Sequence, residues 1–358
     1  FEVCPKCASK SASVYDRRKI RVKDAPIRGV GIILEIIKRR FFCKPCKKPF
    51  TEPVEGIAKS SRTTRRYERS VHWACENFAD MQKVRRAYNC SNNYLYKARY
   101  SELERKSKEK QTTHWPKSIG VDEHGWKRNK LLGCTDFVTM VVDHKNKKLI
   151  DVVEGKTTAD LKVALNHIQG KENVKNVTLD LCDPFAAFAR DFFPNAKLVA
   201  DKFHVLRLLT PHINRHRKLI TGDKRTLPVR RLLLRNGKDL EYFKRQALWA
   251  WLSNYPELKE LYSFKERMHG FYRINGYERA SKAFRKMTDA LAFSSLPELK
   301  RLRKTLLKWK HAILNYFSTG LTNARLEGFN NVAKTVKKRS YGIKSFKNYR
   351  LLLRNACC

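Results

Sequence analysis

A single carboxylate, Glu327, lies among amides and ammonium groups in TNARLEGFNNVAKTVKKRSYG, residues 322–342. In a helix, these polar side chains share one face while the apolar residues gather on another. One interpretation is a solvated surface helix with a stray acid. The other is that Glu327 faces a bound metal ion, beside amides and ammonium groups that meet phosphates. The groups expected to contact phosphate are Asn323, Asn330, Asn331, Lys334, Lys337, Lys338 and Arg339.

Two further acids, Asp122 and Asp180, lie where a sheet could bring them together. From Ser118 onward the sequence predicts three strands, a helix, a strand, a helix and a strand. This order is typical of a mixed sheet of the ribonuclease-H type, in which the first strand, carrying Asp122, neighbours the fourth, which ends near Asp180. Two adjacent carboxylates repel one another and divalent cations relieve the repulsion, so we expect a magnesium site.

Other polar residues near these strands leave alternatives open. Glu123 follows Asp122, but strand alternation sends the two side chains to opposite faces. Asp183 competes with Asp180 for the second position, although it could simply cap the helix that begins at Pro184. The stretch DKFHV holds two residues that could support the metal ligands or form an ion pair at a strand end. They are Asp201 and His204.

The cysteines predict a separate metal site near the amino terminus. Cys4 and Cys7 form one C-x-x-C turn, and Cys43 and Cys46 form another. Two such turns supply the four thiolates of a structural tetrahedral zinc site. The residues between the turns predict strands, so we expect a zinc ribbon that holds one Zn²⁺ and performs no chemistry. Spacing that suits metal better than disulfides indicates a reducing cytoplasm.

The next segment predicts a helix-turn-helix. Residues 59–78 predict a basic helix, and residues 81–106 predict a short helix, a turn at 89–91 and a second helix. Paired short helices also occur without DNA, but the charge of the chain favours DNA binding. The side chains of the second helix expected to reach bases or phosphates are Asn92, Asn93, Tyr96, Lys97 and Arg99.

The composition favours a polyanionic partner. The chain has 77 Lys and Arg against 34 Asp and Glu, a formal charge of +43. Self-repulsion of this size indicates nucleic acid, and we expect no membrane association because no segment approaches the roughly 18 uninterrupted apolar residues of a spanning helix. A content of 42% hydrophobic residues predicts a folded, multidomain protein.

In this order, the cysteine pairs, the helix-turn-helix and the acids resemble bacterial insertion-sequence transposases of the DDE class, ISL-three type. The resemblance runs almost end to end, including GVDEHG, LDLCDPFAAFARDFFPNAKLVADKFHV and FKNYRLLLR. It implies an α/β fold with a ribonuclease-H-like mixed sheet, interrupted by a helical insertion and preceded by the zinc ribbon and helix-turn-helix. It also implies that Asp122, Asp180 and Glu327 form the catalytic triad and hold two Mg²⁺ or Mn²⁺ ions.

The resemblance implies a role in transposition. Such a protein binds double-stranded DNA at the element's terminal inverted repeats and at the target, and it cleaves and transfers DNA strands. A homodimer on DNA and a cytoplasmic, nucleoid-associated location in a bacterium are expected. The expected domains are a zinc ribbon at 1–58, a helix-turn-helix at 59–112, a first catalytic part at 113–205, a helical insertion at 206–315 and a second catalytic part with the Glu helix at 316–358.

Two other functions remain open from the sequence. A non-catalytic, sequence-specific DNA-binding regulator derived from a transposase would use the same amino-terminal modules without the acids. An RNA-binding structural protein would account for the charge alone. The order of the three acids favours the enzyme over both.

Overall fold

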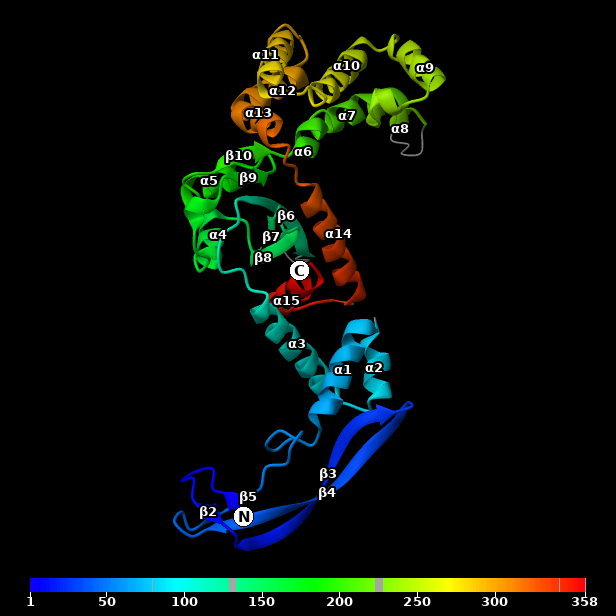
Figure 1. Cartoon of the computed structure of the whole chain (residues 1–358). Helices are drawn as coiled ribbons and strands as arrows, with labels where there is room; N and C mark the ends of the chain where they lie inside the picture. Colours follow the sequence, from blue (N-terminus) through cyan, green and yellow to red (C-terminus); the bar gives the residue numbers. More distant parts are fainter. Residues whose placement is uncertain (79, 129–132, 223–227, 341, 358) are drawn as a thin grey trace. The chain divides into compact units, whose positions relative to one another are not determined.

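The computed structural model describes residues 1–78, 80–128, 133–222, 228–340 and 342–357, and Figure 1 follows the chain through them. The chain divides into two compact units. The first comprises Phe1–Lys110 and Lys337–Asn355, and the second comprises Gln111–Val336 and Ala356–Cys358. No helix in the described ranges is long and apolar enough to cross a membrane.

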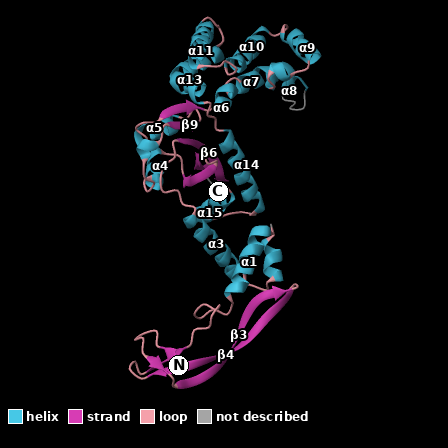
Figure 2. Ribbon diagram, in the orientation of Figure 1, coloured by secondary structure: helices cyan, strands magenta, loops and turns pink. Residues whose placement is uncertain are grey.

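A long antiparallel hairpin dominates the start of the first unit, as Figure 2 shows. Its turn consists of Arg28 and Gly29, with φ of 50° and 81°. Positive φ at both positions is the type I′ geometry that matches the twist of the flanking strands, and glycine adopts it without steric cost. The strands of this region are β1 (Glu2–Val3), β2 (Lys10–Ser11), β3 (Val14–Ile27), β4 (Val30–Cys43) and β5 (Lys48–Thr51).

Three helices follow the hairpin and form a small core of their own. Each begins at a side chain that caps its free backbone N–H groups: Thr64, Asp80 and Ser91. The turn before the third helix contains Asn89 with φ 44°, as the predicted helix-turn-helix requires. The helices are α1 (Arg65–Asn77), α2 (Met81–Ala87) and α3 (Asn92–Glu109).

The carboxyl-terminal helix α15 (Phe346–Ala356) belongs to this first unit through α3. Arg354 Nη2 donates to the carbonyl of Ser107 at 3.3 Å, and Asn355 Nδ2 donates to the carbonyl of Leu103 at 3.1 Å. Residues 337–355, which the sequence analysis assigned to the second catalytic part, therefore cluster with residues 1–110. These contacts join segments far apart in sequence, so local patterns do not predict them.

A buried carboxylate ties the hairpin to α1. Asp24 on β3 is 2% exposed and accepts from Thr64 Oγ1 at 2.7 Å and from Arg66 Nε at 3.0 Å. Thr64 also caps α1 by accepting from the Tyr67 N–H at 3.0 Å. The pKa of Asp24 lies well below its usual range, and the main cause is the hydrogen bond from the Arg66 guanidinium. The hairpin and the start of α1 are therefore joined by a buried polar contact.

The second unit is built on a five-stranded mixed sheet with the order β10-β9-β6-β7-β8. β6 pairs antiparallel with β7 and parallel with β9, so the first strand of this sheet neighbours the fourth. This confirms the predicted sheet of the ribonuclease-H type. The strands are β6 (Ser118–Arg128), β7 (Thr135–Asp143), β8 (Lys148–Glu154), β9 (Asn176–Leu179) and β10 (Lys197–Ala200).

Helices cover this sheet and form the insertion. α14 carries Glu327, and the insertion lies between β10 and α14, as predicted. The helices are α4 (Thr158–Leu165), α5 (Asp183–Phe192), α6 (Lys202–Arg207), α7 (Thr210–Thr221), α8 (Pro228–Leu234), α9 (Tyr242–Leu252), α10 (Pro256–Phe271), α11 (Tyr277–Ala292), α12 (Pro297–Lys308), α13 (Lys310–Thr319) and α14 (Ala324–Arg339).

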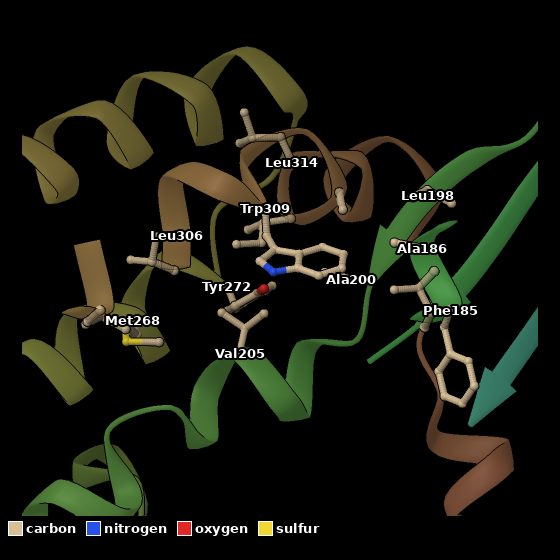
Figure 3. Packing of buried hydrophobic residues seen from close by; sticks show 14 of the residues in the cluster. Phe185, Ala186, Leu198, Ala200, Val205, Met268, Tyr272, Leu306, Trp309 and Leu314 are labelled. Atoms are coloured by element: carbon tan, nitrogen blue, oxygen red, sulfur yellow. The ribbon is translucent and has the colours of Figure 1, made fainter. Parts of the chain in front are cut away.

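One apolar core runs from the sheet into the insertion. Figure 3 shows Phe185 and Ala200 near the sheet and Trp309 among the insertion helices, all in the same buried cluster. Asn315 of α13 donates from Nδ2 to the carbonyl of Leu198 at 2.8 Å, which fixes the insertion to β10. Because the cluster is continuous, the insertion is part of the second unit's core and not a loosely attached loop.

Four cysteines from the two C-x-x-C turns meet beside the hairpin. Sγ atoms of Cys4, Cys7, Cys43 and Cys46 all lie within 4.8 Å of one another. Hydrogen bonding with Ser9 lowers the pKa of the Cys7 thiol to about 6, and the Cys7 sulfur in turn raises the pKa of Cys46 to about 12. A cation among the four sulfurs relieves this conflict, so the cluster fits the predicted structural zinc.

Zinc should leave the protein when one of these thiols is removed. Cys43→Ser deletes a buried ligand, and we expect the variant to lose most of the about one equivalent of zinc that a four-thiolate site holds. Metal content by mass spectrometry measures this, and limited proteolysis reports unfolding of residues 1–58. Cys134→Ser, at an exposed cysteine outside the cluster, is the matched control. Full zinc retention in Cys43→Ser would contradict the assignment.

Asp24→Asn should weaken the first unit. Loss of the charge-assisted bonds is expected to lower the free energy of unfolding by about 1–3 kcal/mol at neutral pH. Because the folded pKa of Asp24 lies below its unfolded value of about 3.9, this stabilisation is complete above that value and disappears as pH falls below it. Denaturant unfolding of both proteins should therefore differ at pH 7 and converge in acid.

The exposed Glu35, paired with Lys19 and Arg21, supplies the control for this measurement. Glu35→Gln should leave the unfolding midpoint close to that of the original chain, because exposed ion pairs contribute little. An equal loss in both variants would show that general charge balance stabilises the unit, and not the buried contact of Asp24.

Candidate active site

Asp122 and Asp180 lie side by side because their strands are neighbours. β6 and β9 run parallel, with Val121 opposite Leu179. Asp122 comes next on β6, and Asp180 is the first residue after β9. Asp122 is only 8% exposed, and burial together with the Asp180 charge raises the pKa of Asp122 to about 7. The two carboxylates are thus close enough that the negative charge of Asp180 disfavours ionisation of Asp122.

Hydrogen bonds fix the orientation of Asp122. Its Oδ1 accepts from the backbone N–H of Glu123 at 2.8 Å. Its Oδ2 accepts from Asn330 Nδ2, on α14, at 2.8 Å. The side chain of Glu123 points elsewhere and pairs with Lys156 at 3.2 Å, in line with the predicted strand alternation. Asp122 is therefore held by the helix that carries Glu327.

His204 forms ion pairs with two acids at the start of α6. Its Nδ1 lies 2.8 Å from Asp180 Oδ1 and 3.1 Å from Asp201 Oδ2. The carboxylates of Asp180 and Asp201 together raise the pKa of His204 to about 10. Ligand atoms of these three residues lie within 4.8 Å of one another, so they are a possible cation site. Both expected supporting residues thus lie beside Asp180.

Asn323 anchors the first turn of α14 against the sheet. It is 4% exposed, its backbone N–H donates to Asp201 Oδ1 at 2.9 Å, and its Nδ2 lies 3.4 Å from the Val121 carbonyl. Its Oδ1 accepts from Thr178 Oγ1. The sequence analysis expected Asn323 and Asn330 to contact phosphate. The structure instead engages both amides with the sheet, because the polar face of α14 packs on the acidic edge.

Glu327 lies on the same face of α14, four residues after Asn323 and three before Asn330. Both of those neighbours contact the acidic edge, so Glu327 lies on the face of α14 that is turned toward that edge. Its side chain is exposed to solvent. Among the described residues, the group of ligand atoms within 4.8 Å of one another contains Asp180, Asp201 and His204 and does not include Glu327.

Asp183 lies apart from this cluster. It begins α5 and forms an ion pair with Lys308 of α12 at 2.6 Å. Its side chain is 66% exposed. The neighbour of Asp122 is thus Asp180, and Asp183 serves the amino-terminal end of its helix, where negative charge is favourable.

The remaining predicted residues lie on exposed faces of α14 and α3. Lys337 and Arg99 are half-buried, and burial lowers the pKa of Lys337. The exposed members are Asn331, Lys334, Lys338 and Arg339 on α14 and Asn92, Asn93, Tyr96 and Lys97 on α3.

Sequence reasoning missed the residues that let α14 approach the sheet. A Cβ on Gly120 would lie 2.8 Å from Leu326 Cδ1 and 3.0 Å from both His144 Nε2 and Thr178 Oγ1. His144 Nε2 and Thr178 Oγ1 are themselves 2.7 Å apart. The sequence offered two hints to this contact. Gly120 stands two residues before Asp122, and Thr178 stands in a buried strand two residues before Asp180.

Two family models match the chain. The model of ISL3-type DDE transposases, described as "Transposase", matches residues 119–353. A second, described as the "zinc-finger of transposase IS204/IS1001/IS1096/IS1165", matches residues 1–46 and coincides with the cysteine cluster. Together these matches include both acidic strands, α14 and the hairpin.

Relatives resemble the chain over nearly its whole length. The transposase for insertion sequence element IS1001 of Bordetella parapertussis is 22% identical over 380 residues, covering 99% of this chain and 88% of that relative. The transposase for IS1557 of Mycobacterium tuberculosis is 23% identical over 381 residues, covering 96% and 82%. Since the first model alone spans more than half of the 358 residues, the chain belongs to the ISL3 family of insertion-sequence transposases.

Proposed function

We propose that the chain binds the terminal inverted repeats of its element and performs metal-dependent DNA strand cleavage and transfer through Asp122, Asp180 and Glu327. The observation that supports this most directly is the buried Asp122 beside the half-buried Asp180, an arrangement that raises the pKa of Asp122 to about 7. A divalent cation between two such acids favours their charged forms. Carboxylate oxygens are the ligands that Mg²⁺ and Mn²⁺ prefer.

Glu327 would be the third ligand. It shares a helix face with Asn323 and Asn330, which both contact the acidic edge, and within the described part of the chain no ion pair engages its exposed carboxylate. When bound, two Mg²⁺ or Mn²⁺ ions would supply activation of the attacking hydroxyl and stabilisation of the leaving oxygen. The protein's own contribution is positioning and charge, which is what phosphoryl transfer chiefly needs.

Neighbouring side chains hold the proposed ligands in place. Asn330 orients Asp122, and His204 holds Asp180 while Asp201 holds His204. Asp201 is further fixed by the backbone N–H of Asn323. These contacts reduce the rotamer freedom that the acids would otherwise lose on meeting the ions and the DNA.

The positive charge supplies the DNA surface. Exposed cations on α14 would contact the backbone without sequence preference, and α3 would read the element's end. Pairing two ends requires at least a homodimer, and the expected location is the bacterial cytoplasm, on the nucleoid. The proposed backbone contacts are Asn331, Lys334, Lys337, Lys338 and Arg339, and the proposed end-reading residues are Asn92, Asn93, Tyr96, Lys97 and Arg99.

The test is cleavage and joining of a labelled duplex that carries the element's own end, with Mg²⁺ or Mn²⁺. Asp122→Asn, Asp180→Asn and Glu327→Gln should each lower the cleavage rate by roughly 100- to 1,000-fold or more, because each removes a carboxylate that would hold a divalent cation at the reacting phosphate. End binding, measured by gel shift, should persist in all three variants.

Asp183→Asn is the matched control, since the carboxylate of Asp183 pairs with Lys308 away from the acid pair. We expect it to cut the duplex as the original chain does. End-specific binding without cutting under either metal would indicate that the chain is a DNA-binding regulator and not an enzyme. Normal cutting by Glu327→Gln would remove Glu327 from the triad while leaving the aspartates in place.

A further inference from the structure

A cleft of 560 Å³ lies within the first unit, between one face of α3 and the segment that follows α14. Residues 93–104 of α3 supply one wall. Described residues from 342–351 supply the other. Both walls belong to the same compact unit, although some 240 residues separate them in sequence. The chain thus returns to the helix-turn-helix directly after the helix that bears Glu327.

The second wall is held firmly in place. Lys347 Nζ lies 3.3 Å from Glu104 Oε1, and both residues line the cleft. One helical turn further, Leu351, Leu352 and Leu353 are buried, and the contacts of α15 to the carbonyls of α3 follow. A packed helix therefore supports the wall, so that its polar side chains face the cleft from a fixed base.

The chemistry of the lining is aromatic and cationic. Tyr96 and Tyr100 are stacked, with ring centroids 6.3 Å apart and planes 18° apart, and Tyr96 is 42% exposed. Lys97 and Lys344 are exposed at opposite walls. Of the described lining residues only Glu104 is acidic, and Lys347 neutralises it. Aromatic faces for bases beside ammonium groups for phosphates are what proteins use to hold nucleic-acid strands.

The second wall also limits which form of DNA, duplex or single strand, fits against this face of α3. The major groove, about 12 Å wide, admits one helix. Residues 342–348 line the same face of α3 that carries Asn93, Tyr96 and Lys97, so α3 with this wall is too broad to enter the groove along that face. An unpaired strand has no such restriction, and its bases are free to stack on Tyr96.

We propose that this cleft binds an unpaired DNA strand, with a base against Tyr96 and phosphates at Lys97 and Lys344. The proposal rests on the proposed function only in taking DNA as the ligand. It assigns a new role to residues 342–348 and limits duplex reading by α3 to residues outside the cleft lining, such as Asn92 and Arg99. Strands frayed or cut at an element's end have this form.

The test compares two fluorescein-labelled duplexes carrying the terminal repeat, one blunt and one with a single-stranded overhang, by anisotropy with the full zinc-loaded chain and no divalent cation. The original chain should bind the overhang more tightly. Tyr96→Ala should weaken overhang binding by roughly 5- to 100-fold and blunt binding by a smaller factor, while Tyr96→Phe keeps the ring and should bind as the original does.

Lys344→Ala tests the second wall. Loss of one phosphate contact to a single strand should reduce the log-log salt slope of overhang binding by about 0.7. Lys108→Ala, at an exposed lysine of α3 outside the cleft lining, is the control and should leave the slope unchanged.

Several outcomes would overturn the proposal. Equal binding of both duplexes, or an equal loss with both in Tyr96→Ala, would make this face of α3 a duplex reader. A loss in Lys108→Ala as large as in Lys344→Ala would indicate charge alone, and a changed oligomeric state in Tyr96→Ala would indicate a protein interface. Overhang preference without any metal-dependent cutting would leave the cleft intact and reject the transposase chemistry. Normal metal-dependent cutting without overhang preference would support the transposase chemistry and reject the cleft as a single-strand site.

Discussion

The second unit is constrained by the repulsion between two carboxylates that its sheet places together, because the surrounding structure must offset it. Parallel pairing of β6 with β9 sets Val121 opposite Leu179 and thereby makes Asp122 and Asp180 neighbours. Burial adds to the cost, as the raised pKa of Asp122 records. A fold that retains such a pair must offset it, because an uncompensated buried charge is strongly destabilising. The polar contacts around the pair are best understood as that compensation.

Compensation comes from two elements that meet the sheet at its acidic edge. The imidazolium of His204, on α6, lies between Asp180 and Asp201, and the amide of Asn330, on α14, donates to Asp122. These groups neutralise or solvate the acids. Gly120 permits the approach, since any side chain there would collide with Leu326. Gly120 thus allows the helix that carries Glu327 to pack on the strand that carries Asp122.

The succession of strands and helices and the cysteine spacing were predictable because both are local. The succession is typical of a ribonuclease-H-type sheet, whose strand order places Asp122 beside Asp180, and two C-x-x-C turns predicted the four-sulfur cluster. The helical periodicity of 322–342 grouped Asn323, Glu327 and Asn330 correctly on one face. It could not show that this face meets the sheet, because the partner strands lie some 150–200 residues earlier. For the same reason it assigned to DNA two amides that the sheet engages.

The division of the chain into two compact units also depends on contacts between segments far apart in sequence. Residues 337–355 complete the first unit through contacts with α3, and nothing in their own pattern identifies α3 as the partner. As a result α14 begins in the second unit, and its last residues, Lys337–Arg339, are assigned to the unit that holds α1, α2 and α3. Glu327 thus lies on a helix whose residues divide between the two compact units, because contacts distant in sequence, and not the helical pattern itself, decide where each unit ends.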